Sequence, residues 1–267
     1  MTGNHERGSA LLSSSSRVVP TLELMAAIYR LSRAGGPRSP RFTEYVKHAE
    51  HVFGLSGYNP MAGDAAHDAV THLMEIGAER LAEEAMHDVV GRLGHADAIT
   101  LALVVASTGM WTDRLATEVA HRTALERSAH RGTVLLWTRE SIERDDVLRE
   151  AAAETVRIAW TARHGDAASV VTMLAREGLA YAPSLNQWAP TPPDTSAGMN
   201  DVLAVLGDSR TLGDIVAVLY GDDAASELGH PPAGLPARTG FAWAAARADE
   251  FIAQRGAATA LADFRPA

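Results

Sequence analysis

The stretch Ile99-Thr100-Leu101-Ala102-Leu103-Val104-Val105-Ala106 is the longest apolar run in this chain, and its conformation decides the fold. It lies within residues 97–107, which are apolar on nearly all sides, so we expect the segment to be buried. The run is far too short to cross a membrane as a helix. We interpret it as a short buried helix inside a helical protein.

The composition around this run also favours helices. Alanine is abundant, aromatic residues make up only 6% of the chain, and alternating β-branched residues are almost absent. Residues 133–138 (Thr-Val-Leu-Leu-Trp-Thr) have the composition of a strand, but a lone strand has no partner, so we expect an extended connector there. The predicted fold class is all-α, a helical bundle or stacked helical hairpins with a smaller helical C-terminal part.

Glycine and proline divide the chain into helical segments. Asp64 is a suitable N-cap for a helical stretch that reaches about residue 93. Its apolar face turns by more than a right angle near Gly77, so the sequence leaves open whether this stretch is one helix or two. Further helices are expected at about residues 20–33, 41–53, 111–131, 141–163, 166–178, 199–206, 211–220, 222–228 and 240–255.

The same pattern predicts four regions along the chain. We expect residues 1–17 to form a disordered tail. Their end is polar and serine-rich, and the segment does not have the pattern of a secretion signal. Residues 18–180 form the main helical domain. Residues 181–198 contain four prolines and are expected to form a loop, which residues 199–267 follow as the helical C-terminal part.

Composition also limits the possible functions. The chain has no cysteine, which excludes disulfides, thiolate nucleophiles and cysteine zinc sites and agrees with a cytoplasmic location. Lys47 is the only lysine, so a phosphate-binding P-loop lysine is absent. A net charge of −9 argues against a nucleic-acid-binding protein. No apolar stretch has the length of a membrane span, so we expect a soluble protein without a membrane partner.

A short repeat is the sharpest motif. Residues 79–87 (Glu-Arg-Leu-Ala-Glu-Glu-Ala-Met-His) are followed 34 residues later by residues 113–121 (Asp-Arg-Leu-Ala-Thr-Glu-Val-Ala-His). On a helix, the arginine, glutamate and histidine of each copy would share one face. The tetratricopeptide family has the same period, and residues 165–171 resemble the start of its second helix. This resemblance implies stacked helical hairpins.

Each copy of the repeat contains a glutamate followed three residues later by a histidine. Locally this pattern resembles the di-iron carboxylate proteins, in which such pairs on facing helices present oxygen and nitrogen to the same metal. The chain departs from that family because it lacks a further ligand-bearing helix between the two motifs. The resemblance makes Glu84, His87, Glu118 and His121 candidate ligands for iron, manganese or zinc.

Glu118 and Arg122 are the strongest candidates for catalytic residues. On the helix expected at residues 111–131, both point toward the apolar face formed by Trp111, Leu115, Leu125 and Ala129. A carboxylate in such a position must be paired or bound to a ligand. One interpretation is an ion pair between Glu118 and Arg122, four residues apart. In the other, Glu118 is a metal ligand or general base, and Arg122 or Arg114 binds an anionic substrate.

Two hypotheses of function follow from these residues. The first is a soluble helical enzyme of small-molecule metabolism, metal-dependent through glutamate and histidine ligands. The alternative is a non-enzymatic protein, either a helical-repeat-like interaction protein or a small-ligand-binding protein. A small molecule is the expected partner in the first case, and the sequence leaves the substrate and the oligomeric state open.

Overall fold

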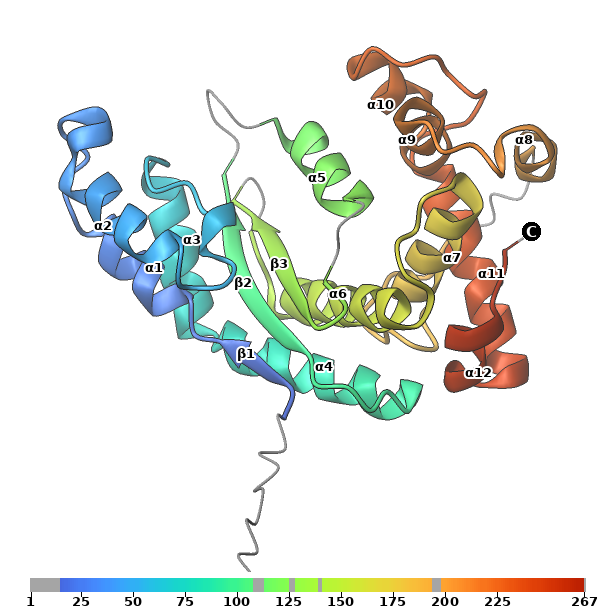
Figure 1. Ribbon diagram of the computed structural model, residues 1–267, viewed down its shortest axis with the longest axis horizontal. Helices are drawn as coiled ribbons and strands as arrows, with labels where there is room; N and C mark the ends of the chain where they lie inside the picture. The colour runs from blue at the N-terminus through green and yellow to red at the C-terminus, as the bar shows by residue number, and fades with distance from the viewer. Residues whose placement is uncertain (1–14, 108–112, 125–127, 139–140, 194–197, 267) are drawn as a thin grey trace, which may run out of the picture.

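The computed structural model describes residues 15–107, 113–124, 128–138, 141–193 and 198–266. These residues form a three-stranded parallel sheet and twelve α-helices (Figure 1). The strands are β1 (Arg17–Val19), β2 (Thr100–Ala106) and β3 (Arg131–Trp137), in the order β1-β2-β3. The protein is therefore mixed α/β and mostly helical, and the predicted all-α class is wrong.

The error has one origin, the apolar run that forms β2. This strand lies in the centre of the sheet, where Ala102 pairs with Val19 of β1 and with Thr133 of β3. A central parallel strand is buried on both faces and therefore reads as a continuous apolar run, which periodicity cannot distinguish from a buried helix. Because β2 was expected to be helical, β3 was expected to have no partner and to be a connector.

Helices account for most of the remaining described residues. They are α1 (Leu22–Tyr29), α2 (Pro40–Ala49), α3 (Asp64–Glu75), α4 (Ala78–Leu93), α5 (Arg114–Thr123), α6 (Arg144–His164), α7 (Val170–Tyr181), α8 (Met199–Leu206), α9 (Leu212–Tyr220), α10 (Asp222–Glu227), α11 (Thr239–Arg255) and α12 (Ala257–Asp263). Two short 3₁₀ turns, Gly36–Arg38 and Leu55–Gly57, precede and follow α2.

Gly77 separates two helices and answers the question that the sequence left open. Its φ of 67° lies in the left-handed region, which glycine adopts without the steric cost of a side chain. The chain therefore turns between α3 and α4, and the apolar face of α4 packs against α6. Glu84 consequently lies on the exposed side of α4.

The sheet has two different faces. Val134 and Leu136 of β3 are buried, and Gly132 on the same face lies against α6. Thr133, Leu135 and Trp137 alternate with them and are only partly buried. They face α5, which Figure 1 shows above β2 and β3 while α4 lies below the sheet.

Helix α5 is shorter than the sequence predicted. It begins at Arg114, where the Asp113 side chain accepts a hydrogen bond of 2.7 Å from the backbone N–H of Ala116, and it ends at Thr123. The predicted helix over residues 111–131 instead gives way to β3. Trp111 and Leu125 lie outside the described residues.

The C-terminal helices pack directly onto the rest of the molecule. A side chain at Gly178 of α7 would place its Cβ only 2.6 Å from the carbonyl oxygen of Ala244 in α11, so glycine permits this close approach. One continuous hydrophobic core contains residues from both parts of the chain.

No described helix has the length and apolar character needed to span a membrane. Most of the expected tail, residues 1–14, lies outside the described residues.

Candidate functional site

A cleft of about 510 Å³ lies between α5, β3, α6 and α11. Its volume falls within the range of about 300 to 1,000 Å³ that is typical of small-molecule sites. The partly exposed face of β3 borders it, and the cleft extends to the carboxyl end of that strand, where parallel α/β proteins bind ligands. The position and size of this cleft identify it as the candidate site.

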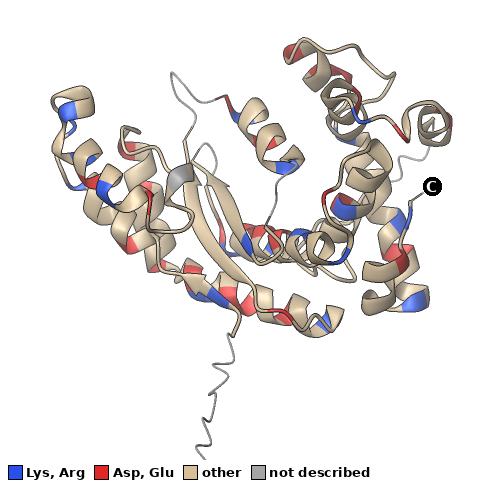
Figure 2. Cartoon of the chain, in the orientation of Figure 1, with Lys and Arg blue, Asp and Glu red and all other residues tan. Residues whose placement is uncertain are grey.

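The walls of the cleft combine apolar residues with charged side chains. The charged side chains are Arg114, Glu118, Arg122, Asp146, Arg149, Glu150, Glu154, Arg157 and Arg238. Figure 2 shows charged residues on α6 and at the end of α5, whereas β2 between the flanking strands carries none. Among the described lining residues, arginines outnumber carboxylates although the whole chain has a net charge of −9. The cleft therefore differs in charge from the rest of the protein.

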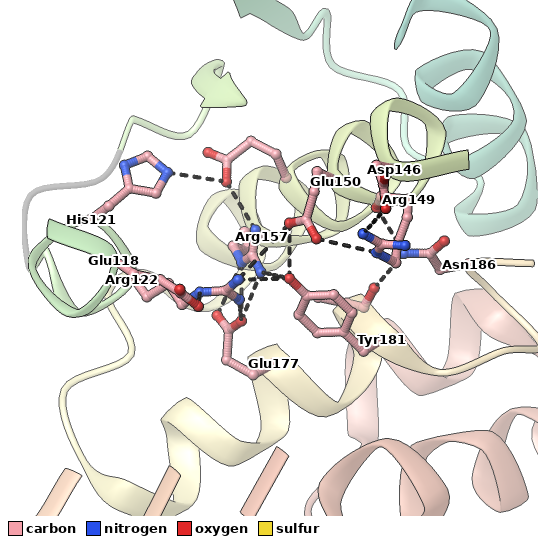
Figure 3. A network of polar contacts seen from close by, with 12 residues as sticks. Glu118, His121, Arg122, Asp146, Arg149, Glu150, Arg157, Glu177, Tyr181 and Asn186 are labelled. Atoms are coloured by element: carbon pink, nitrogen blue, oxygen red, sulfur yellow. Dashed lines mark hydrogen bonds and ion pairs between the residues drawn. The ribbon is translucent and has the colours of Figure 1, made fainter. Parts of the chain in front are cut away.

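Beneath the cleft, a buried carboxylate on α7 joins three arginines. Glu177 is 1% exposed, and its oxygens accept hydrogen bonds from Arg157 at 2.9 Å and Arg122 at 3.0 Å (Figure 3). Arg176 donates a third hydrogen bond, of 3.0 Å. Burial alone would raise the pKa of Glu177, but the three guanidinium groups outweigh it and hold this pKa well below its usual range. Glu177 therefore stays ionised.

Tyr181 connects this buried cluster to the cleft. Its hydroxyl accepts hydrogen bonds from Arg122 at 2.8 Å and Arg157 at 3.1 Å, and donates one to Glu150 at 2.9 Å (Figure 3). Burial raises the pKa of Tyr181 above its usual value, so the hydroxyl keeps its proton and remains a donor. Glu150 is thereby fixed at the cleft wall.

Burying the arginines around Glu177 has an energetic cost. Removing charged groups from water costs several kcal/mol for each ion, and apolar replacement of a buried ion network is often neutral or stabilising. Arg122, Arg157 and Arg176 are each less than 10% exposed. Stability of the fold alone therefore gives no reason to place three arginines beneath a cleft.

A second buried carboxylate, Glu154, lies where α6 approaches β3. It is 1% exposed, accepts a hydrogen bond of 3.3 Å from Arg157, and lies 3.8 Å from Nε2 of His121 on α5. A Cβ at Gly132 would lie 2.4 Å from the Glu154 Oε1 atom. The absence of a side chain at Gly132 therefore makes room for the carboxylate beside His121.

Glu118 lines the cleft and lies between two arginines. Its Oε1 atom is 3.1 Å from Nε of Arg122 and 3.8 Å from Nη1 of Arg238. The Glu118 side chain is 13% exposed, whereas that of Arg238 is 55% exposed. The predicted ion pair between Glu118 and Arg122 is therefore present, and both residues line the cleft.

Arg238 stands on an unusual backbone. With φ of 58°, it is the only non-glycine among the described residues that has a positive φ. This left-handed conformation costs a residue with a side chain about 1 to 2 kcal/mol. The strained backbone places a positive charge at the start of α11, where the Arg238 guanidinium lies 5.0 Å from the centre of the Phe241 ring. Strained residues of this kind are concentrated at functional sites.

The structure separates the four predicted metal ligands. Glu118 and His121 both line the cleft from α5. Glu84 and His87 are exposed on α4, where Glu84 lies 3.8 Å from Arg80, and α4 is on the opposite side of the sheet (Figure 1). In the described parts of the chain, no three histidine or acidic side chains form a group that could hold a metal ion. The predicted site of four ligands is therefore not assembled.

Sequence reasoning missed the contributions of α6, α7 and α11 to the site. The missed residues are Glu150, Glu154, Arg157, Arg176, Glu177, Tyr181 and Arg238. A signal was present, because Glu154, Arg157, Arg176 and Glu177 interrupt runs of apolar residues in helices that are buried on nearly all sides. Charges in such positions must be paired. No comparable signal marks Arg238, whose role depends on its backbone conformation.

No family model matches the chain, and no curated protein or solved structure is significantly similar to it.

Proposed function

We propose that the protein is an enzyme of small-molecule metabolism that binds an organic anion in the cleft. Arg238 would bind the anionic group, Glu118 would act as a general base, and Arg122 would hold the Glu118 carboxylate in position. The observation that carries this proposal is the strained, half-exposed Arg238 beside Glu118. We keep a cytoplasmic location as part of the proposal, because a chain without cysteine needs no oxidising compartment.

The surroundings of Arg238 favour an anionic ligand. Its contact with Glu118 is long, at 3.8 Å, and Arg122 already binds the same carboxylate oxygen at 3.1 Å. An incoming phosphate or carboxylate group would offer Arg238 two shorter hydrogen bonds, which the planar guanidinium favours. The net negative charge of the chain disfavours anions elsewhere on the surface, so binding would be local.

The same geometry suits Glu118 to proton transfer. A general base must lie within hydrogen-bond reach of the proton that it removes. Glu118 lines the cleft and is shielded from most of the solvent, and Arg122 fixes its orientation. A ligand held by Arg238 would therefore lie next to a positioned carboxylate.

One observation favours the alternative, a small-ligand-binding protein without catalysis. Glu118, Glu150 and Glu154 each contact an arginine, so the network already explains their charges. In that case the cleft would bind the same class of anion, and no carboxylate would take a proton from it.

Binding of anions tests the shared part of both proposals. Calorimetric titration with inorganic phosphate, pyrophosphate and citrate should detect binding of at least one of them. Arg238→Ala should weaken that binding about tenfold to a hundredfold, the equivalent of a lost charge-assisted hydrogen bond. Arg247→Ala is the matched control, because Arg247 lies on α11, the helix that Arg238 precedes, is 47% exposed and is outside the cleft. Equal losses in both variants would contradict the proposed site.

The strain at Arg238 has its own test, which needs no ligand. Arg238→Ala and Arg238→Gly both remove the guanidinium, but only glycine accepts the left-handed backbone without cost. We expect the glycine variant to be more stable than the alanine variant by about 1 kcal/mol in urea unfolding. Equal stabilities would show that the backbone at this position is not strained.

Catalysis distinguishes the enzyme from the binding protein. A mixture of sugar phosphates, nucleotides and short dicarboxylates is incubated with the protein, and products are followed by mass spectrometry. Glu118→Gln should abolish conversion while anion binding remains, because the substitution removes the base and leaves Arg238 in place. Binding without conversion of any compound by the unaltered protein would favour the alternative.

A further inference from the structure

A second cavity of about 330 Å³ adjoins the cleft on the other side of His121. It lies between α5 and the face of the sheet that carries Thr133 and Leu135. The described residues of its lining come from the turn after α2 (Gly57 and Asn59), from the carboxyl end of β2 (Ala106 and Ser107), from α5 and from β3.

Three of the described residues border both spaces. His121, Thr133 and Leu135 line the cleft and the second cavity alike. His121 comes from α5, and the other two are neighbours on one face of β3. The two spaces are therefore adjacent compartments along the sheet, with the imidazole of His121 at their boundary.

The two compartments differ sharply in chemistry. The cleft has arginines and carboxylates in its walls, whereas the described residues that line the second cavity include no acidic residue and no arginine or lysine. Ser107, Thr117 and Thr133 supply hydroxyl groups, and the remaining lining is small or apolar apart from Asn59 and His121. Such a lining suits an uncharged group that carries hydroxyls, because it offers hydrogen bonds and no opposing charge.

We infer that the two cavities form one bipartite site for an organic anion with an uncharged, hydroxyl-bearing part, as in a phosphorylated or carboxylated sugar. The anionic group lies in the cleft near Arg238, and the hydroxyl-bearing part lies in the second cavity. His121 contacts the ligand where the two parts meet, since an imidazole can donate and accept hydrogen bonds. This inference rests on the proposed function and specifies its substrate class.

Paired probes test the inference. Inorganic phosphate is compared with ribose 5-phosphate, and acetate with gluconate, by calorimetric titration, so that the two arms distinguish a phosphate from a carboxylate. In at least one of these two comparisons, the sugar derivative should bind about tenfold more tightly than the simple anion, as expected for two additional hydrogen bonds of ordinary strength. The quantity of interest is the affinity ratio, the affinity of the sugar derivative divided by that of the simple anion. An affinity ratio near one in both comparisons would overturn the inference.

Filling the second cavity should remove this preference. Ala120 is exposed and lines the second cavity alone, so Ala120→Phe should fold normally and occupy the space. This variant should reduce the affinity ratio of sugar derivative to simple anion to near one and leave binding of the simple anion unchanged. Ala116→Phe is the matched control, because Ala116 is exposed on the same helix and lines neither cavity.

A second variant keeps the test valid if phenylalanine disturbs α5. Thr117→Val preserves the shape of the side chain and removes one hydroxyl, so the ratio should fall about threefold to tenfold. An unchanged ratio in Thr117→Val and Ala120→Phe would overturn the bipartite site. If anion binding still depends on Arg238 in that case, the proposed function stands and only the inference fails.

Discussion

Gly132 shows how a single residue makes room for the site. It lies in β3 with its Cα facing α6, and an added Cβ would meet Oε1 of Glu154 at 2.4 Å and Cδ1 of Ile158 at 2.7 Å. Both side chains are buried, so an added Cβ would have to displace them from their present contacts. Gly91 of α4 is the opposite case, since an added Cβ there has no described atom within 4 Å.

The same substitution at these two glycines should have effects of opposite sign. Gly132→Ala should lower the free energy of unfolding by about 1 to 3 kcal/mol, because overpacking displaces Glu154 from Arg157. Gly91→Ala should raise it by about 0.5 to 1 kcal/mol, because alanine restricts the unfolded chain and favours the helix. Urea unfolding of both variants measures the difference, and a stabilised Gly132→Ala would contradict the close packing around Glu154.

The short repeat illustrates how environment assigns different roles to equivalent residues. Glu79 accepts hydrogen bonds of 2.7 Å from the backbone N–H of Thr21 and 3.0 Å from that of Leu22, and so caps α1. Asp113, at the same position in the second copy, caps its own helix. Glu84 is exposed, whereas Glu118 lies in the cleft. The repeat therefore does not create two equivalent sites.

At the scale of elements, α5 is held mainly by charged groups. Val119 and Arg122 are its only buried residues, whereas α6 buries thirteen. Arg122 binds Glu177 of α7, and Arg176 donates a hydrogen bond to the backbone carbonyl of Arg122. This helix forms a wall of both cavities, so its attachment controls the site.

Helix α5 should consequently open more easily than its neighbours. Few buried apolar contacts give a segment a low free energy of local opening. Hydrogen exchange followed by mass spectrometry should show fast exchange across α5 and slow exchange across α6. A ligand that occupies the cleft should slow exchange in α5 without a comparable change in α4, whose exposed face lies across the sheet. Equal protection of α5 and α6 in the free protein would contradict this description.

At the scale of the whole molecule, one core joins all the layers, and the charged cluster lies within it. Glu177 contacts Arg122 from α5, Arg157 from α6 and Arg176 from its own helix α7. Removing one partner from a buried ion network costs about 3 to 5 kcal/mol, because the remaining charges stay buried. Loss of this carboxylate therefore affects the whole fold.

Global stability should accordingly depend on pH through Glu177. Because the folded protein holds this pKa well below its ordinary value of 4.5, the contribution of Glu177 is complete above pH 4.5. It decreases as the pH falls below 4.5 toward the depressed pKa of the folded state. Glu177→Gln should lower the free energy of unfolding by about 3 to 5 kcal/mol at pH 7. Between pH 7 and acid, this free energy should decrease less in the variant than in the unaltered protein, as measured by urea unfolding. Glu84→Gln, which alters an exposed carboxylate, should keep the pH dependence of the unaltered protein.

The sequence by itself determined most of the helices and the spacing that pairs Glu118 with Arg122, and it singled out Gly77 without deciding whether the chain turns there. These features depend on neighbours within one or two turns, where spacing along the chain fixes distance in space. Tertiary structure decided the rest. Whether residues 100–106 form a strand depends on partners distant in the chain, since β2 pairs with β1 and β3. The cleft likewise depends on α6, α7 and α11, which bring Glu154, Glu177 and Arg238 to α5 over separations that no local pattern encodes.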